Sequence, residues 1–536
     1  MARWLAAGLW LLVSATAAAQ ETPPPAPERT AAQWLEDLRS GDVPARKKAV
    51  YALWKMGPTM KEGVADLGAA LSDPDPYVAD VTGRILIRLG PGAADSVDGA
   101  IAALEDERPK VRIAAIRIIQ GVGERGVDAS GSLLSRLDDE VPEVRRAAAS
   151  TFGTLGYFMG GSGMGAQAVA GLRGLFGDPD PGVRKDAAFA LSSYGDAALP
   201  AVGDLAGLLK DEVAEVRAFA ANSLWNLGAA AGKEALDGLY GLLGDPDAMV
   251  RGRAFAAVAE TGPEDPRLFD AMRTGMEDSA PEVRQTCSWI LGTKFADRPG
   301  VVDRLLEATA DPAQQLRLNA ITCLTKVRPL PEGAWAALAK GLEDRVAQIR
   351  ANCAQCIGEI GSEAARFVPR LVEMLRDTED FNAQVASTAL GRIGPAAAEA
   401  IPDLRRRWRT RRDPYERTNA GYSLALVSPR DRPAIVSFFL AVLRGESKEV
   451  PVGLAASAAG EIGPDAAAAV PLLRGFLKSG DRSIRIGAVT ALGKMGKAGL
   501  EAVPELEALK RDPWDRLREA AGFALEALRK AEGGAR

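Results

Sequence analysis

Apolar residues recur along this chain with the spacing of an α-helix that is buried on one side. The segment 211–228 reads DEVAEVRAFAANSLWNLG, and its main apolar positions are Val216, Ala220, Leu224 and Leu227. Residues spaced in this way fall on one stripe of a helix, whereas the polar residues between them fall on the other side. The segment is therefore predicted to be an amphipathic helix that packs on a neighbour.

The same pattern is repeated along nearly the whole chain. In most copies an Arg follows the first apolar position, and an Asp stands six residues before that Arg. There are fifteen copies, spaced by 33 to 35 residues apart from one step of 39. The Arg position falls at residues 46, 79, 112, 145, 184, 217, 251, 284, 317, 350, 383, 417, 452, 485 and 518. The departures are Ala79, Ala383 and Val452 at the Arg position, and Ser40, Arg411, Glu446 and Ser479 at the Asp position.

Pro, Asp and Gly mark the ends of this helix. Asp75 and Asp180 each precede a Pro and are predicted N-caps, because Pro is favoured in the first turn and Asp accepts a free backbone N–H there. A Gly just after the last apolar position is predicted to end the helix, since it adopts a left-handed backbone without steric cost. The predicted caps are Gly57, Gly90, Gly123, Gly156, Gly195, Gly228, Gly262, Gly361, Gly394, Gly463 and Gly496.

A second apolar segment lies between each Gly and the next Asp, as in 367–375 (FVPRLVEML) and 502–512 (AVPELEALKRD). Each copy is thus predicted to be two antiparallel helices, and such a unit must stack on its neighbours to bury its apolar surface. The predicted fold class is all-α, a right-handed α-solenoid or superhelix of about 15 helix pairs over residues 31–530. An extended loop at 156–167 and a flexible tail at 531–536 complete the prediction.

The repeated sequence resembles the HEAT repeat of the armadillo-like superfamily, in the short form named after the phycobilisome lyases. Residues 178–195, DPDPGVRKDAAFALSSYG, carry the resemblance most clearly. It implies that the recurring Asp and Arg form a structural ladder between successive repeats, and a pair repeated so often is far more easily explained by the scaffold than by catalysis. The predicted ladder includes Asp211, Arg217, Asp245, Arg251, Asp278, Arg284, Asp311, Arg317, Asp344 and Arg350.

The repeat register also predicts a binding face. The position six residues after the first apolar residue points away from the apolar stripe, and a neighbouring position nine residues after it adds Trp54 and Trp225. The resemblance implies that the Arg-bearing helix of each pair lines a concave surface. Large aromatic residues on an exposed face often mark interaction sites. The alternative is that some of them are tucked between repeats. The candidate binding residues are Tyr51, Trp54, Phe189, Asn222, Trp225, Trp289, Gln355 and Tyr422.

The N-terminus has the pattern of a secretory signal peptide. Arg3 supplies a positive charge, an apolar stretch follows, and small residues end at Ala19, where cleavage is expected. An uncleaved membrane anchor is the alternative, but the apolar stretch is short for a span of about 20 residues. Residues 20–30 form a Pro-rich linker. The protein is expected to be exported to the periplasm or the extracellular space, with no transmembrane segment in the mature chain.

Composition narrows the chemistry. The chain has no His, which removes Ser-His-Asp and Cys-His catalysis and most zinc and non-haem iron sites. Deoxyhypusine hydroxylase has similar repeats but binds iron through His-Glu pairs, so its activity is not transferred to this chain. A formal net charge of −5 does not suggest a nucleic-acid partner. We expect no cofactor, no metal and no catalytic residue.

Four Cys in an exported chain raise the question of disulfides. Their positions in the repeat favour buried packing thiols. A disulfide between two of them, or a metal site, remains an alternative. The four are Cys287, Cys323, Cys353 and Cys356.

An Arg-rich tract is the strongest local charge signal. Guanidinium groups bind phosphate, sulfate or carboxylate groups through paired hydrogen bonds, so the tract is a candidate patch for an anionic partner. The alternative is a solvated outer side of one helix. The patch comprises Arg405, Arg406, Arg407, Arg409, Arg411 and Arg412.

These features favour an exported, non-enzymatic scaffold that binds a protein or an extended polymer through its concave face. We expect it to be a monomer. Two alternatives stay open: a lyase-like or other enzyme-associated subunit, and a structural element of the cell envelope that binds anionic surfaces.

Overall fold

The computed structural model describes residues 29–57, 62–159, 162–377 and 380–533. The predicted signal peptide and most of the predicted linker fall on residues 1–28 and so lie outside the described residues. Arg29 and Thr30 do not belong to a linker. Thr30 is the N-cap of α1 (Ala31–Leu38), and Thr30 and Gln33 bond each other's backbone N–H groups in a capping box.

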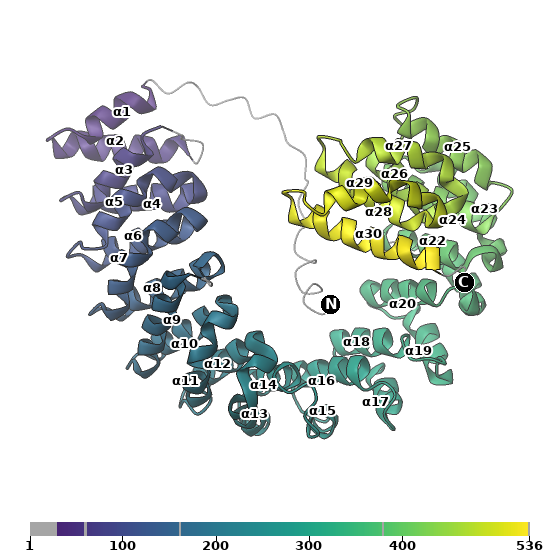
Figure 1. Ribbon diagram of the computed structural model, residues 1–536, viewed down its shortest axis with the longest axis horizontal. Helices are drawn as coiled ribbons and strands as arrows, with labels where there is room; N and C mark the ends of the chain where they lie inside the picture. Colours follow the sequence, from purple (N-terminus) through teal and green to yellow (C-terminus); the bar gives the residue numbers. More distant parts are fainter. Residues whose placement is uncertain (1–28, 58–61, 160–161, 378–379, 534–536) are drawn as a thin grey trace. The chain divides into compact units, whose positions relative to one another are not determined.

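Every regular element within these ranges is a helix or a short 3₁₀ turn, which confirms the predicted all-α solenoid class. The chain divides into unit 1, residues 1–265, and unit 2, residues 266–536. In unit 1 the Arg-bearing helices form one layer of the stack and the intervening helices the other (Figure 1). The Arg-bearing helices of unit 1 are α2 (Val43–Met56), α4 (Pro76–Leu89), α6 (Pro109–Gly121), α8 (Pro142–Met159), α10 (Pro181–Ala190), α12 (Ala214–Leu227) and α14 (Ala248–Thr261).

The intervening helices of unit 1 are shorter, and several of them continue a 3₁₀ turn. They are α3 (Val64–Ala69), α5 (Val97–Ala103), α7 (Ser130–Leu134), α9 (Gly163–Gly174), α11 (Val202–Leu208) and α13 (Gly232–Gly241).

Unit 2 repeats the same plan. The helices that carry the Arg register are α16 (Pro281–Lys294), α18 (Gln314–Leu324), α20 (Ala347–Ile360), α22 (Asp380–Ile393), α24 (Pro414–Val427), α26 (Val452–Ile462), α28 (Arg482–Lys494) and α30 (Asp515–Gly533). The others are α15 (Leu268–Gly275), α17 (Val301–Ala308), α19 (Glu332–Gly341), α21 (Val368–Met374), α23 (Ile401–Thr410), α25 (Arg432–Leu443), α27 (Val470–Phe476) and α29 (Val503–Leu509).

The predicted apolar stripe forms the core. Val216, Ala220 and Leu224 of α12 are fully buried between helix layers. Asp75 caps α4 by accepting the backbone N–H groups of Tyr77 and Val78, at 3.0 and 3.3 Å. Burial of the stripe supplies the main stabilising term, at roughly 25 cal/mol per Å² of apolar surface.

Most of the predicted Gly caps are confirmed by a positive φ, for example 58° at Gly228 and 77° at Gly361. Gly262 ends α14 as predicted, but with a φ of −128° rather than a left-handed backbone. One prediction is wrong. Gly156 lies inside α8, where it allows close packing: a Cβ there would meet Ser193 Oγ at 2.1 Å.

The 39-residue repeat also differs from prediction. Residues 156–159 extend α8 and residues 163–167 begin α9, so the predicted loop at 156–167 is for the most part helical. Helix α8 has 18 residues, because its apolar stripe continues through Leu155 to the buried Met159. At the C-terminus, residues 531–533 belong to α30 rather than to a tail, and 534–536 lie outside the described residues.

The Asp–Arg ladder joins successive repeats. Arg217 donates from Nε and Nη2 to the carboxylate of Asp245 in the next repeat, at 2.7 and 2.9 Å, and from Nη1 to the carbonyl oxygen of Asp211 in its own repeat, at 2.8 Å. The carboxylate of Asp245 also accepts the backbone N–H of Asp247 at 2.9 Å, which orders the turn before α14. The same contacts recur for Arg145, Arg184, Arg284 and Arg350.

One gap in the ladder is filled by another residue. The Arg position of α4 is Ala79, yet Asp106 in the next repeat is still paired. Arg108 donates from Nε and Nη2 to the Asp106 carboxylate, both at 2.8 Å, and from Nη1 to the carbonyl oxygen of Asp73 at 2.8 Å. These are the partners that an Arg at residue 79 would bind, so the repeat junction keeps its bonds.

Candidate interaction surface

The exposed side of the Arg-bearing helices carries several of the predicted binding residues. Tyr51 on α2 is 48% exposed, Phe189 on α10 is 49% exposed and Trp225 on α12 is 37% exposed. Trp54, Asn222 and Trp289 are half-buried, and Gln355 is exposed. The repeat register thus separates surface from core at these positions.

Tyr422 is a correction to the predicted set, because its side chain is only 8% exposed. Its hydroxyl lies 2.9 Å from Thr388 Oγ1 on α22, so the ring spans the seam between α22 and α24 instead of pointing to solvent. Burial raises the pKa of the Tyr422 hydroxyl. Tyr422 is therefore a packing residue of unit 2.

We use the name aromatic cluster for Phe189 on α10 and for Phe219 and Trp225 on α12, of which Phe189 and Trp225 are exposed and Phe219 is half-buried. The rings of Phe189 and Phe219 meet edge to face, with centroids 5.3 Å apart. The ammonium of Lys185 lies 5.7 Å from the centre of the Phe219 ring. Aromatic rings that stay partly in water next to a cation are typical of surfaces that bind another molecule.

Sequence reasoning missed the most exposed aromatic pair. Tyr157 and Phe158, at the end of α8, are 78% and 53% exposed. They belong to the extra residues of the 39-residue repeat, which the sequence analysis interpreted as loop. The signal that was available is the continued apolar spacing from Phe152 through Leu155 to Met159, which predicts helix up to that point.

A groove crosses the same side of unit 1 next to the aromatic cluster. It has a volume of about 450 Å³ and is lined by residues of α6, α8 and α10. Arg117 and Gln120 lie on one wall, and Arg146 donates from Nε to Asp186 Oδ2 at 2.9 Å on the other. In unit 2, a groove of about 490 Å³ follows the ladder turn at Asp311 and Asp344, where the polar groups already bind one another.

The Arg residues of the predicted patch for an anionic partner lie in different surroundings in the structure. Arg405 pairs with Asp431 at 2.7 Å, and Arg406 pairs with Asp403. Arg409 and Arg412 remain exposed, with no ion-pair partner in the part of the chain that the structure describes.

Arg407 does not belong to a surface patch at all. Its side chain is buried, donating from Nη1 to the carbonyl oxygen of Leu375 at 2.8 Å and from Nη2 to Glu416 Oε2 at 3.2 Å. Arg411 also donates to Glu416, at 3.0 Å. This cluster stands where the ladder pair is replaced by Ala383 and Arg411, so it belongs to the repeat junction.

The four Cys are free, buried thiols, as the packing interpretation predicts. Burial raises the pKa of Cys323 to about 12 and that of Cys356 to about 11. Burial also raises the pKa of Cys287 and Cys353. Thiols with raised pKa values stay protonated near neutral pH, which makes them poor nucleophiles.

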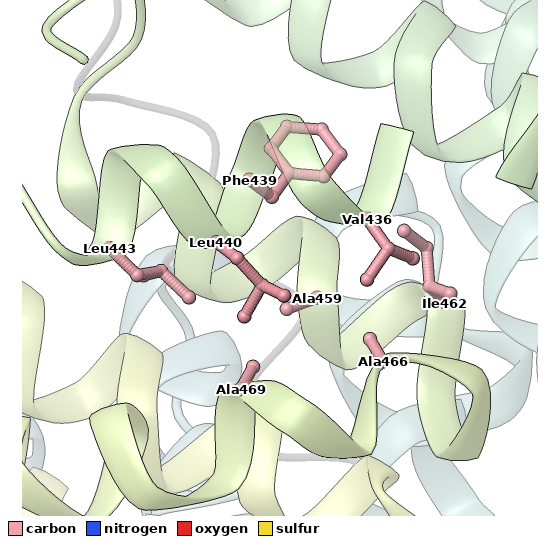
Figure 2. A pocket seen from close by; sticks show the side chains of 8 residues that line it. All are labelled: Val436, Phe439, Leu440, Leu443, Ala459, Ile462, Ala466 and Ala469. Atoms are coloured by element: carbon pink, nitrogen blue, oxygen red, sulfur yellow. The ribbon is translucent and has the colours of Figure 1, made fainter. Parts of the chain in front are cut away.

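The apolar cavity of unit 2 is a packing seam rather than a ligand site. Figure 2 shows side chains of α25, α26 and the following 3₁₀ turn converging on it, among them Phe439, Leu440 and Ile462. The space between them totals about 170 Å³, but none of it admits a water molecule.

Within the described ranges, no three metal-ligating side chains come together, and no helix has the length and apolar character needed to span a membrane.

Comparison with known proteins establishes the repeat type and the fold. The family model described as HEAT repeats matches residues 133–207, 335–425 and 436–526. No curated protein matches the sequence.

Among solved structures, yeast importin-beta (Kap95p) is similar over 94% of this chain and 79% of that chain, with 13% identity and a TM-score of 0.65. The Kap95:Nup1 complex gives the same values. Importin beta in an ammonium sulfate condition is similar over 93% of this chain and 79% of that chain, with 14% identity and a TM-score of 0.62. At this identity the likeness establishes the fold alone.

Proposed function

Since the chain is a HEAT-repeat protein, we propose that it is a non-enzymatic scaffold that binds a protein partner through the exposed side of its Arg-bearing helices. The observation that carries this proposal is the aromatic cluster Phe189, Phe219 and Trp225, which α10 and α12 leave partly in water. Exposed aromatic side chains are the residues that most often dominate the binding energy of protein interfaces. The neighbouring groove of about 450 Å³ adds a hollow in which a partner side chain fits.

The non-enzymatic part of the proposal rests on the chemistry of the described residues. The four thiols are protonated and buried, and the recurring Asp and Arg side chains are engaged with one another. The Kap95:Nup1 complex is a structure of a similar fold with a bound partner. Because one fold serves many functions, the similarity of fold to this complex supports only a general role in binding for the present chain.

The proposed compartment is the periplasm or the extracellular space. The charged start, the short apolar stretch and the small residues before Gln20 favour export. N-terminal sequencing of the mature protein tests this, with Gln20 as the expected first residue. Retention of Met1 contradicts it.

Affinity capture from the envelope of the exporting cell tests the scaffold. The double variant Phe189→Ala, Trp225→Ala is expected to retain about tenfold less partner than the wild type, because truncating aromatic residues at the centre of an interface costs more than about 1 kcal/mol and a loss of about 1.4 kcal/mol lowers affinity tenfold. Tyr415→Ala is the matched control, since Tyr415 is 61% exposed but lies on α24 of unit 2. Equal capture by the double variant and the wild type contradicts the proposal.

A further inference from the structure

The first Arg-bearing helices of unit 1 are strongly basic. Helices α2, α4 and α6 are neighbours in the stack. Together they hold a single acidic residue, Asp80, against nine basic ones. Two of the nine, Arg46 and Arg112, belong to the ladder. We use the name basic face for the exposed side chains of Lys48, Lys55, Arg84, Arg88 and Arg117.

The charge of the basic face is largely uncompensated. Asp80 pairs with Arg84 at 2.9 Å. The other four cations have no carboxylate partner in the described residues. Like charges gathered on one side create a positive potential that attracts an anionic ligand, and the attraction is weakened by salt.

Aromatic rings hold three of these cations in place, and the Lys48 ammonium lies 5.9 Å from the centre of the Trp34 ring. The Lys55 ammonium lies 4.5 Å from the centre of the Tyr51 ring, and the Arg88 guanidinium lies 5.2 Å from the centre of the Trp54 ring. These cations cover ring faces on which the bases of a single-stranded nucleic acid would otherwise stack. The arrangement therefore favours carboxylate groups over nucleobases as partners.

The basic face is not a general property of the repeat. In unit 2, the positions that correspond to Arg84 and Arg117 carry neutral side chains such as Thr322, Gln355 and Thr388. Thr322 and Asn352 hydrogen-bond each other between α18 and α20, at 3.3 and 3.4 Å. Unit 2 thus has neutral side chains at the register where α4 and α6 present cations.

We propose that the basic face binds an acidic polypeptide segment in an extended conformation. Packed helices lie about 8–10 Å apart, and an extended chain in the polyproline II conformation advances about 9 Å per turn of three residues, so that every third side chain points the same way. An acidic side chain at every third residue would therefore meet the cations of α2, α4 and α6 in turn. Exposed apolar surface at Tyr51 and Ile87 accommodates the residues between. This inference deepens the proposed scaffold function and rests on it.

Fluorescence anisotropy with the full chain tests the inference. The probe is a labelled peptide of about 15 residues with Glu at every third position and small or apolar residues between. We expect saturable binding that weakens as salt rises. The triple variant Lys55→Glu, Arg88→Glu, Arg117→Glu should weaken binding by about tenfold or more, because three attractive contacts become repulsive. The control Arg409→Glu, Arg412→Glu changes exposed charges on α23 and its C-terminal end, and should leave binding unchanged.

Three outcomes overturn the inference. In the first, the triple variant binds the acidic peptide as tightly as the wild type does, while its circular dichroism melting curve matches that of the wild type. In the second, a peptide with Lys in place of Glu binds the wild type equally well. In the third, the wild type prefers a single-stranded oligonucleotide to the acidic peptide. Failure here is distinguishable from failure of the scaffold proposal. If the acidic peptide does not bind but the double variant Phe189→Ala, Trp225→Ala still captures about tenfold less partner, the scaffold proposal stands and the proposal of an acidic partner fails.

Discussion

At the scale of the residue, a ladder Arg combines three roles. Arg217 neutralises a carboxylate of the next repeat, accompanies it with two hydrogen bonds, and satisfies a carbonyl oxygen at the turn of its own repeat. The pair is mostly removed from water, with side chains 13% and 5% exposed. Removing one member leaves a buried charge without a partner, which is more costly than removing both.

Arg217→Ala is expected to lower the free energy of unfolding by about 2–4 kcal/mol, because Asp245 and the Asp211 carbonyl oxygen lose their donor. Arg409→Ala should change it by less than about 0.5 kcal/mol, since Arg409 is exposed and has no ion-pair partner among the described residues. Melting temperatures from circular dichroism check the comparison. Similar values for the two variants would show that the ladder does not stabilise the array.

The burial of some side chains can be predicted from the sequence, whereas the burial of others cannot. Arg407 stands three residues after the buried Leu404, on the stripe that α23 turns inward, so helical spacing alone separates it from the exposed Arg409. Tyr422 could not be assigned in this way. Its register position is that of the exposed column, and only the hydrogen bond to Thr388 across the repeat junction shows that the ring lies in the seam.

At the scale of the element, α8 shows how an insertion is absorbed. The extra residues of the 39-residue repeat lengthen the helix to 18 residues and place Tyr157 and Phe158 in solvent. Gly156 makes this possible, because the helix packs closely on the 3₁₀ turn at the end of α10. Tyr194 from that side is buried, and its hydroxyl donates to the carbonyl oxygen of Phe152 at 3.0 Å.

Gly156→Val should destabilise unit 1 by about 1–3 kcal/mol, because the new side chain would overlap Ser193 Oγ and the Tyr194 ring, which lie 2.1 and 2.8 Å from a Cβ at this position. Gly203→Ala in α11 is the control, since nothing lies within 4 Å of its Cβ and a helical Gly→Ala exchange is neutral or stabilising. Urea unfolding followed by circular dichroism measures both. A neutral Gly156→Val would mean that α8 does not pack as described.

Helix existence was predictable and helix ends were less so. The apolar spacing and the Pro and Asp signals gave the two helices of each repeat, as at α4 and α10. A Gly after the last apolar residue predicts the end of a helix in eleven of the copies. Gly156 instead lies within α8 because of packing against the neighbouring repeat. Only a residue without a side chain lets α8 approach the 3₁₀ turn at the end of α10 this closely.

At the scale of the whole molecule, the ladder makes stability depend on pH. Burial alone would raise the pKa values of Asp178, Asp211 and Asp245, but their Arg partners hold them below the ordinary range. The Arg108 guanidinium lowers the pKa of Asp106 to about 2. A carboxylate with a lowered folded-state pKa stabilises the fold above its unfolded pKa, near 4, and loses that contribution as pH falls through the folded value.

The melting temperature is therefore expected to fall steeply between about pH 4 and pH 2, as several ladder carboxylates take up protons together. Arg108→Ala isolates one of them. It should cost about 1–2 kcal/mol at pH 7 and clearly less at pH 2, where Asp106 is about half protonated in the wild type and mainly the bond from Arg108 to the carbonyl oxygen of Asp73 remains to be lost. Thermal unfolding of both proteins across this range is the measurement. A cost that does not depend on pH would contradict the Arg108–Asp106 assignment.

The ladder also gives the array a direction. Each repeat that keeps both ladder residues offers a carboxylate to the repeat before it and a guanidinium to the repeat after it, as Asp211 does to Arg184 and Arg217 does to Asp245. Such repeats are joined head to tail, and one of them can be removed or duplicated while the new junction keeps one of each group. A cut between two of them leaves one unpaired Arg on one fragment and one unpaired Asp on the other. Two such fragments therefore carry matching ends, and in a mixture they would rejoin in one order only.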